Sequence, residues 1–184
     1  MTRLSKMVLI STFLLMLIPI GALAATPSTA PQDGDMAVSF NAGFGNAFDD
    51  DFEGDPVFTG TFEYYMTPRI SWRGLLGFTS FDADFPGGDA SVDTTFITAN
   101  VLYNWEGGRI HPYVTGGLGF YQKDASSDLP SEFDETVLGV NGGGGIDWFL
   151  GSRWALEFEG TFHGLTGENP DTILLVTAGF KFWF

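Results

Sequence analysis

The sequence predicts an all-β protein, an eight-stranded antiparallel up-and-down barrel whose strands cross a membrane. Three observations lead to this fold class. Apolar and polar residues alternate in eight segments of about ten residues, the length that a tilted membrane-crossing strand needs. The connections between these segments alternate between tight turns and longer loops. Tryptophans gather near the tight turns, whereas acidic residues gather in the longer loops.

The composition agrees with a β-protein and excludes several other classes. The 184 residues include 25 Gly and 19 Phe, both above ordinary usage, and no Cys, which excludes disulfides, thiolate metal sites and thiol nucleophiles. The net charge of −15 argues against nucleic acid as a partner, because phosphate binding needs a basic face. The hydrophobic content of 44% is too high for a disordered acidic chain.

The first 24 residues have the pattern of a signal peptide. Arg3 and Lys6 precede an apolar run at 7–18, and Ala22-Leu23-Ala24 forms a small-residue cleavage site. The run is shorter than the roughly 20 residues that a transmembrane helix needs, which disfavours a membrane anchor. We therefore expect a signal peptide at 1–24, a flexible N-terminal tail at 25–35 and a barrel domain at 36–184.

Each expected strand has one apolar face and one face rich in small or polar residues. In the second segment, for example, Phe62 and Glu63 take opposite faces. The alternation has exceptions, because Leu75, Phe96 and Leu102 lie on the polar side of their segments. The eight segments are 38–44, 57–66, 70–79, 97–105, 110–121, 137–148, 153–163 and 174–184.

The connections indicate two chemically different rims. Three are tight turns, at 66–69, 106–109 and 150–153, and each holds one Arg. Four are longer loops, at about 47–56, 82–94, 123–135 and 164–171, and together they hold 16 of the 23 acidic residues. Short turns at one end and long loops at the other are typical of outer-membrane barrels. All five tryptophans lie near a tight turn or the C-terminus, which predicts an aromatic girdle at one rim: Trp72, Trp105, Trp148, Trp154 and Trp183.

Apolar and polar residues alternate along the strands of membrane barrels and of soluble ligand-binding barrels. The two classes differ in which face of the strands points into the barrel. The tryptophan girdle and the glycine content favour the membrane barrel, because small inward residues leave room for long charged side chains in a narrow lumen. A lumen charge network that fills the barrel is therefore expected, with a gated polar pore as the alternative reading. Its members are Glu63, Arg73, Glu157, Glu159 and Lys181.

The last eight residues resemble the signal that the outer-membrane assembly machinery reads. The matching residues of this assembly signal are Thr177, Gly179, Phe182 and Phe184. The stretch 111–120, HPYVTGGLGF, resembles the fifth strand of small porin-like barrels. The chain is therefore similar to the opacity-protein-like and OmpA-like outer-membrane β-barrels over nearly all of 36–184. The resemblance implies a place in the outer membrane of a Gram-negative envelope, with the tail and tight turns in the periplasm.

The same resemblance implies only a broad role, since that family is functionally mixed. We expect a structural or surface-interaction role: envelope integrity, adhesion, or lipopolysaccharide contact through the acidic outer loops. The expected partners are outer-membrane lipid, lipopolysaccharide, the barrel-assembly machinery and an unidentified extracellular ligand, without a cofactor. The alternatives are an outer-membrane enzyme that modifies lipid A and a narrow channel for small solutes.

No catalytic residue is assigned. His163 is the only His deep in an expected strand, and a polar lumen residue is its default interpretation. Barrels that cut acyl chains from lipid A place a Ser two residues after the His, where this chain has Leu165.

No metal site is assigned either. Asp49, Asp51 and Glu53 resemble the start of a Ca²⁺-binding loop, followed by Gly54 at the sixth position. The twelfth position is Gly60, where a bidentate Glu is required. The segment is therefore only a weak candidate for binding divalent cations.

Overall fold

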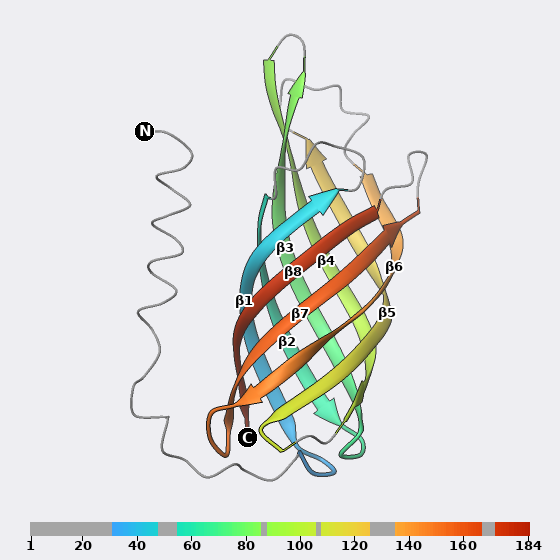
Figure 1. Ribbon diagram of the computed structural model, residues 1–184. Helices are drawn as coiled ribbons and strands as arrows, with labels where there is room; N and C mark the ends of the chain where they lie inside the picture. Colours follow the sequence, from blue (N-terminus) through green and yellow to red (C-terminus); the bar gives the residue numbers. More distant parts are fainter. Residues whose placement is uncertain (1–30, 48–54, 86–87, 106–107, 126–134, 167–171) are drawn as a thin grey trace.

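A computed structural model confirms the predicted fold class. It describes residues 31–47, 55–85, 88–105, 108–125, 135–166 and 172–184. Each strand pairs with the next in antiparallel fashion, and β8 pairs with β1 to close the barrel (Figure 1). The strands are β1 (Met36–Ala47), β2 (Asp55–Tyr65), β3 (Ile70–Phe85), β4 (Gly88–Asn104), β5 (Ile110–Ala125), β6 (Glu135–Phe149), β7 (Trp154–Leu165) and β8 (Thr172–Trp183). In the described part of the chain, no helix is long and apolar enough to cross a membrane.

The outer face carries an apolar band of the height of a membrane. Large apolar side chains such as Phe40, Leu76 and Phe120 are exposed on it, whereas the polar faces of the strands point inward. On β4 the band extends over residues 97–105, and the next outward side chains, Thr95 and Asp93, are polar and exposed. Nine residues tilted by about 40° span about 23 Å, close to the ~25 Å apolar band of outer-membrane barrels.

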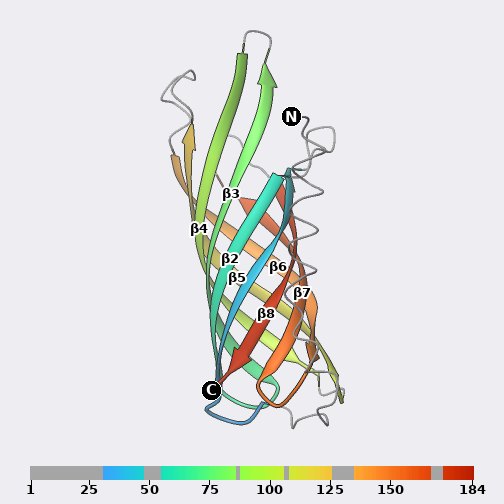
Figure 2. The same ribbon diagram turned by 90° about the vertical axis from the view of Figure 1, so that its left-hand side faces the viewer.

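Two strands continue well beyond this band. The ladder between β3 and β4 extends as far as the pair Phe85 and Gly88, whereas β2 pairs with β3 only up to Thr79. On the other side, β5 pairs with β4 as far as Val92, so the last part of the ladder, 82–85 with 88–91, rises above the neighbouring strands as a two-stranded hairpin (Figure 2). The prediction of a loop at 82–94 is wrong for most of that range. Antiparallel backbone pairing needs no apolar face, so the ladder continues where the sequence becomes acidic.

The tight turns define one end of the barrel, called here the turn end; the opposite end is the loop end. In the β2–β3 turn, the Thr67 hydroxyl accepts hydrogen bonds from the backbone N–H of Ile70 (2.9 Å) and Arg69 (3.2 Å). The β4–β5 turn contains Gly108 at a φ of 69°, a conformation that favours glycine. The chain ends at the turn end too, where the Phe184 N–H bonds to the Met36 carbonyl.

Glycines on the inner face permit the tight curvature of a small barrel. A Cβ added at Gly143 would lie 2.1 Å from the Gly160 carbonyl oxygen of the next strand, too close for any side chain. At Gly145 the added atom would meet the Tyr113 hydroxyl at 2.5 Å, so a larger inward side chain occupies the space that this glycine leaves. Gly160 points outward, and a Cβ there would meet nothing within 4 Å.

Candidate functional site

The structure brings all five predicted lumen charges together in the turn-end half of the barrel. Glu63, Arg73, Glu157, Glu159 and Lys181 are all buried. Four strands contribute them, because the inward positions at this height on β2, β3, β7 and β8 each carry a charged residue. We keep the name lumen charge network for these five residues and Asp147, which joins them.

Arg73 lies at the centre of the network. It is the direct cross-strand partner of Glu63, whose Oε2 lies 3.2 Å from Nη2. The same Nη2 lies 2.7 Å from Glu157 Oε1, and Nη1 forms an ion pair with Glu159. Arg73 therefore contacts three buried carboxylates at once, an arrangement that suits the planar fork of a guanidinium.

Lys181 holds the other side of the network. Its Nζ lies 2.6 Å from Glu63 Oε2, 2.9 Å from Asp147 Oδ2 and 3.6 Å from Glu157 Oε1. The sequence analysis missed Asp147, although it has the inward parity of β6, opposite to that of Ile146 and Trp148. Its addition gives the network four carboxylates and two cations.

Hydroxyl and amide groups complete the network. The Tyr113 hydroxyl lies 2.7 Å from Glu159 Oε2 and 3.0 Å from Glu157 Oε1, and the Arg73 guanidinium lies 5.0 Å from the centre of its ring. The Ser71 hydroxyl donates to Glu63. The Asn41 amide donates to Glu157 at 3.1 Å. Hydrogen bonds of this kind offset the cost of burying charges, so the network can fill the lumen as a stable polar layer.

An apolar cluster closes the barrel below the network, at the turn end. It consists of Ala37, Tyr65, Phe149, Ala155 and Trp183. The rings of Phe149 and Trp183 stack with centroids 4.7 Å apart, and Lys181 Nζ lies 5.2 Å from the centre of the Trp183 ring.

The prediction that Trp183 belongs to the aromatic girdle is wrong, because Trp183 is part of this cluster. Trp183 has the inward parity of β8, between the outward Phe182 and Phe184, so its side chain is buried in the lumen. The other four tryptophans are exposed on the outer face near the turn end: Trp72, Trp105, Trp148 and Trp154.

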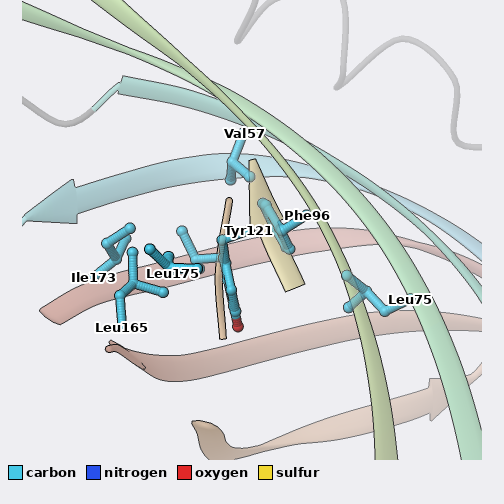
Figure 3. Packing of buried hydrophobic residues seen from close by; sticks show 8 residues of the cluster. Val57, Leu75, Phe96, Tyr121, Leu165, Ile173 and Leu175 are labelled. Carbon is cyan, nitrogen blue, oxygen red and sulfur yellow. The ribbon is translucent and has the colours of Figure 1, made fainter. Parts of the chain in front are cut away.

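A second apolar cluster fills the lumen toward the loop end (Figure 3). Phe96 and Tyr121 stack with centroids 5.5 Å apart, and the His163 ring meets Phe96 edge-on at 5.6 Å. Two of the exceptions in the sequence pattern, Leu75 and Phe96, belong to this upper cluster. Its other members are Val57, Tyr121, Val137, Leu165, Ile173 and Leu175. The third exception, Leu102, is buried as well.

His163 lies inside the lumen, as its polar-face position predicts. Its Nδ1 lies 2.6 Å from the Tyr121 hydroxyl, and its Nε2 lies 2.9 Å from the Thr161 hydroxyl. Both ring nitrogens are therefore satisfied by hydroxyls, and Leu165, two residues further, is part of the upper cluster. These contacts place the imidazole in a packed layer, and among the described residues its hydrogen-bond partners are hydroxyls and not carboxylates.

The remaining predicted site residues differ in how far the structure describes them. The assembly-signal residues lie on β8 and just after it: Thr177 faces the lumen, Gly179 pairs with Asn41, and Phe184 is exposed. Phe182 packs against Trp154 with ring centroids 4.6 Å apart. The weak divalent candidate Asp49, Asp51 and Glu53 lies outside the described residues. Among those described, no three His, Asp or Glu side chains are grouped to hold a metal ion.

Comparisons with known proteins agree with this architecture. A family model described as "Outer membrane protein beta-barrel domain" matches residues 13–182. The comparison with curated protein sequences gives no match. Among solved structures, the chain is similar to Neisserial surface protein A, with a TM-score of 0.66, 14% identity, and coverage of 83% of this chain and 100% of that one.

Two further solved structures are similar to this chain in fold. The attachment invasion locus protein Ail of Yersinia pestis, in complex with the heparin analogue sucrose octasulfate, has a TM-score of 0.59 and 14% identity over 82% of this chain and 100% of that one. The outer membrane enzyme PagL has a TM-score of 0.50 and 13% identity over 79% of this chain and 98% of that one. Likeness at this identity carries the fold and leaves the activity to the residues of this chain.

Proposed function

The chain belongs to the outer-membrane β-barrel family and lies in the outer membrane, and from that premise we propose that it is a closed barrel with a structural and surface-interaction role. The observation that supports this proposal is the filled lumen. Between the two apolar clusters, the lumen charge network leaves Glu63, Arg73 and Lys181 with no exposed surface. A lumen packed in this way favours a role of the outer surface over the passage of solutes.

The outer surface available for contacts is acidic. The loop-end connections and the strand ends beside them carry 16 of the 23 acidic residues, and Asp93 and Asp124 are exposed there. Lipopolysaccharide is itself anionic, so direct contact would be repulsive. We therefore place a divalent cation between the loop carboxylates and lipopolysaccharide phosphates, because hard cations prefer oxygen ligands of both kinds.

The test measures lipopolysaccharide binding by the purified full chain in nanodiscs, with Mg²⁺ and with a chelator. A loop variant carries Asp49→Asn, Asp50→Asn, Asp51→Asn and Glu53→Gln. We expect binding in Mg²⁺, its loss in chelator, and weaker binding by the loop variant. A control variant with Asp33→Asn and Asp35→Asn, at the turn end, should bind like the wild type. Equal binding with and without Mg²⁺ would overturn the cation bridge.

The same purified protein also tests the two alternative functions, an enzyme that modifies lipid A and a channel. A change in the mass of lipid A after incubation with the protein would support an enzyme. Steady ion current through a planar bilayer would support a channel. The absence of both, together with Mg²⁺-dependent binding, supports the surface role.

A further inference from the structure

The outer face of the barrel is hollowed where β7, β8 and β1 lie side by side (Figure 1). This hollow, called here the wall groove, has a volume of about 430 Å³. Three of the side chains that line it are 42–55% exposed and project from the wall: Phe44, Phe158 and Val176. The groove therefore opens to the surroundings of the barrel and not to the lumen. Smaller outward residues complete this lining: Ala42, Gly160 and Ala178.

Small residues at neighbouring register positions make the floor of the wall groove low. Ala42 on β1 pairs with Ala178 on β8, and Gly160 on β7 pairs with Val176. A Cβ added at Gly160 would meet nothing within 4 Å, so the space above this residue is open. Phe158, the β7 partner of Ala178, stands beside the floor. The result is an apolar recess flanked by an aromatic ring.

On two of its strands, the wall groove lies nearer to the loop end than to the turn end. On β1, the next outward position toward the loop end is Asn46, which is polar. On β8, only Leu174 lies between the groove and the exposed Thr172. Toward the turn end, β8 continues with Phe180 and Phe182, which have the same parity. The groove is thus part of the apolar band, in the half that borders the loops.

Only apolar groups can fill the wall groove at this depth. The hydrocarbon core of a membrane contains no water that could occupy a hollow. A recess that stayed empty would lose dispersion contacts along its lining. Lipid tails are as apolar as the lining itself, so packing decides which apolar group binds there.

A second copy of the chain fits this surface less well than an acyl chain does. A stable protein interface buries about 1,200–2,000 Å² in total, whereas the wall groove is a local recess in a convex wall. The rings of Phe44 and Phe158 are half exposed beside the floor and would hold a second barrel away from it. An acyl chain is thin enough to lie between them.

We propose that the wall groove binds one acyl chain of lipid A, the lipid anchor of lipopolysaccharide. The loop end faces outward in the proposed function, so the loop-side half of the apolar band meets the outer leaflet, where lipopolysaccharide lies. The inference rests on that orientation and not on the cation bridge. Lipid A carries acyl chains and phosphates on one molecule, so the same molecule can contact the groove and the loops.

Native mass spectrometry of the purified, folded full chain tests the groove. The protein is equilibrated in Mg²⁺ with equal amounts of lipid A and of a phosphatidylglycerol of similar chain length. We expect the wild type to retain lipid A in preference to phosphatidylglycerol. Gly160→Leu places a side chain in the open space of the groove. It should lower the ratio of lipid-bound to lipid-free protein about tenfold, because the acyl chain loses its packing contacts.

Gly74→Leu is the matched control. Gly74 is an outward glycine on β3 where an added Cβ also meets nothing within 4 Å, and it does not line the wall groove. This variant should retain lipid A like the wild type. Ala178→Leu is a second filling variant if Gly160→Leu folds poorly, as judged by the gel mobility of unboiled samples. Wild-type retention by a folded filling variant, equal loss in the control, or equal retention of the two lipids would overturn the proposal.

The loop variant described above separates this proposal from the cation bridge. Loss of lipid A from Gly160→Leu alone supports the groove and contradicts the bridge. Loss from the loop variant alone supports the bridge and overturns the groove, and loss from both variants supports both contacts. A dimer mass in the wild type that disappears in Gly160→Leu would assign the groove to a second copy and overturn the lipid proposal.

Methyl NMR of the wild type locates the acyl chain without any substitution. Alanine methyl groups are labelled, and the protein is placed in deuterated micelles that contain equimolar protonated lipid A. We expect strong nuclear Overhauser contacts from the acyl chain to Ala42 and Ala178, which line the groove. Contacts to Ala99, an exposed alanine on β4, should be weak. Contacts of equal strength at all three alanines would contradict a specific groove.

Discussion

Replacing Arg73 with Met removes the centre of the lumen charge network and keeps a side chain of similar length. In the wild type, Arg73 contacts Glu63, Glu157 and Glu159. After the replacement, Lys181 alone would face four carboxylates. Removing one partner of a buried ion pair costs about 3–5 kcal/mol, because an uncompensated charge stays buried. We expect Arg73→Met to lower the free energy of unfolding by about that amount.

The assay is urea unfolding in lipid vesicles, followed by tryptophan fluorescence, with the gel mobility of unboiled samples as a check on folding. Arg153→Met is the matched control, since Arg153 is exposed at the β6–β7 turn, and it should stay within about 0.5 kcal/mol of the wild type. Adding Glu157→Gln and Glu159→Gln to Arg73→Met should recover part of the loss by removing two unpaired charges. An Arg73→Met protein as stable as the Arg153→Met control would refute the stabilising role of the network.

Three further outcomes follow from the packing. Gly143→Ala should destabilise the barrel by about 1–3 kcal/mol, because its Cβ would lie 2.1 Å from a backbone oxygen, whereas Gly160→Ala, which meets nothing within 4 Å, should be neutral in the same urea titration. Phe96→Ala should cost about 3–5 kcal/mol in that titration, since it empties the stack with Tyr121 in the upper cluster. Phe184→Ala should reduce the amount of folded protein in outer-membrane fractions several-fold. It should leave the unfolding of the purified protein nearly unchanged, because Phe184 is exposed after the last strand. Equal amounts of the wild type and the variant in the membrane would argue against the assembly signal.

The alternation of apolar and polar residues allowed the barrel to be predicted from the sequence. A strand with a period of two assigns every residue to one face, so the parity that places Phe62 outward also places Glu63 in the lumen. The five predicted lumen charges meet for the same reason. Asp147 could have been found by the same rule, because it lies between Ile146 and Trp148, which share the apolar parity of their segment.

Other features were missed for reasons that differ from one residue to the next. Proximity to the C-terminus suggested that Trp183 belongs to the girdle, although its parity faces the lumen, where it stacks on Phe149. Leu75 and Phe96 broke the expected pattern because the loop-end half of the lumen is filled by apolar side chains. The length of the β3–β4 hairpin was missed because polar residues beyond the apolar band are equally compatible with a loop and with a ladder.

The closed lumen is tested most directly by the conductance of the purified, folded full chain in a planar lipid bilayer. We expect no steady current for the wild type, because an ionic layer centred on Arg73 and Lys181 and an aromatic layer centred on Phe96 and Tyr121 close the lumen in series. A stable, reproducible single-channel current from the wild-type protein would contradict a closed barrel and make the channel the better account of its function.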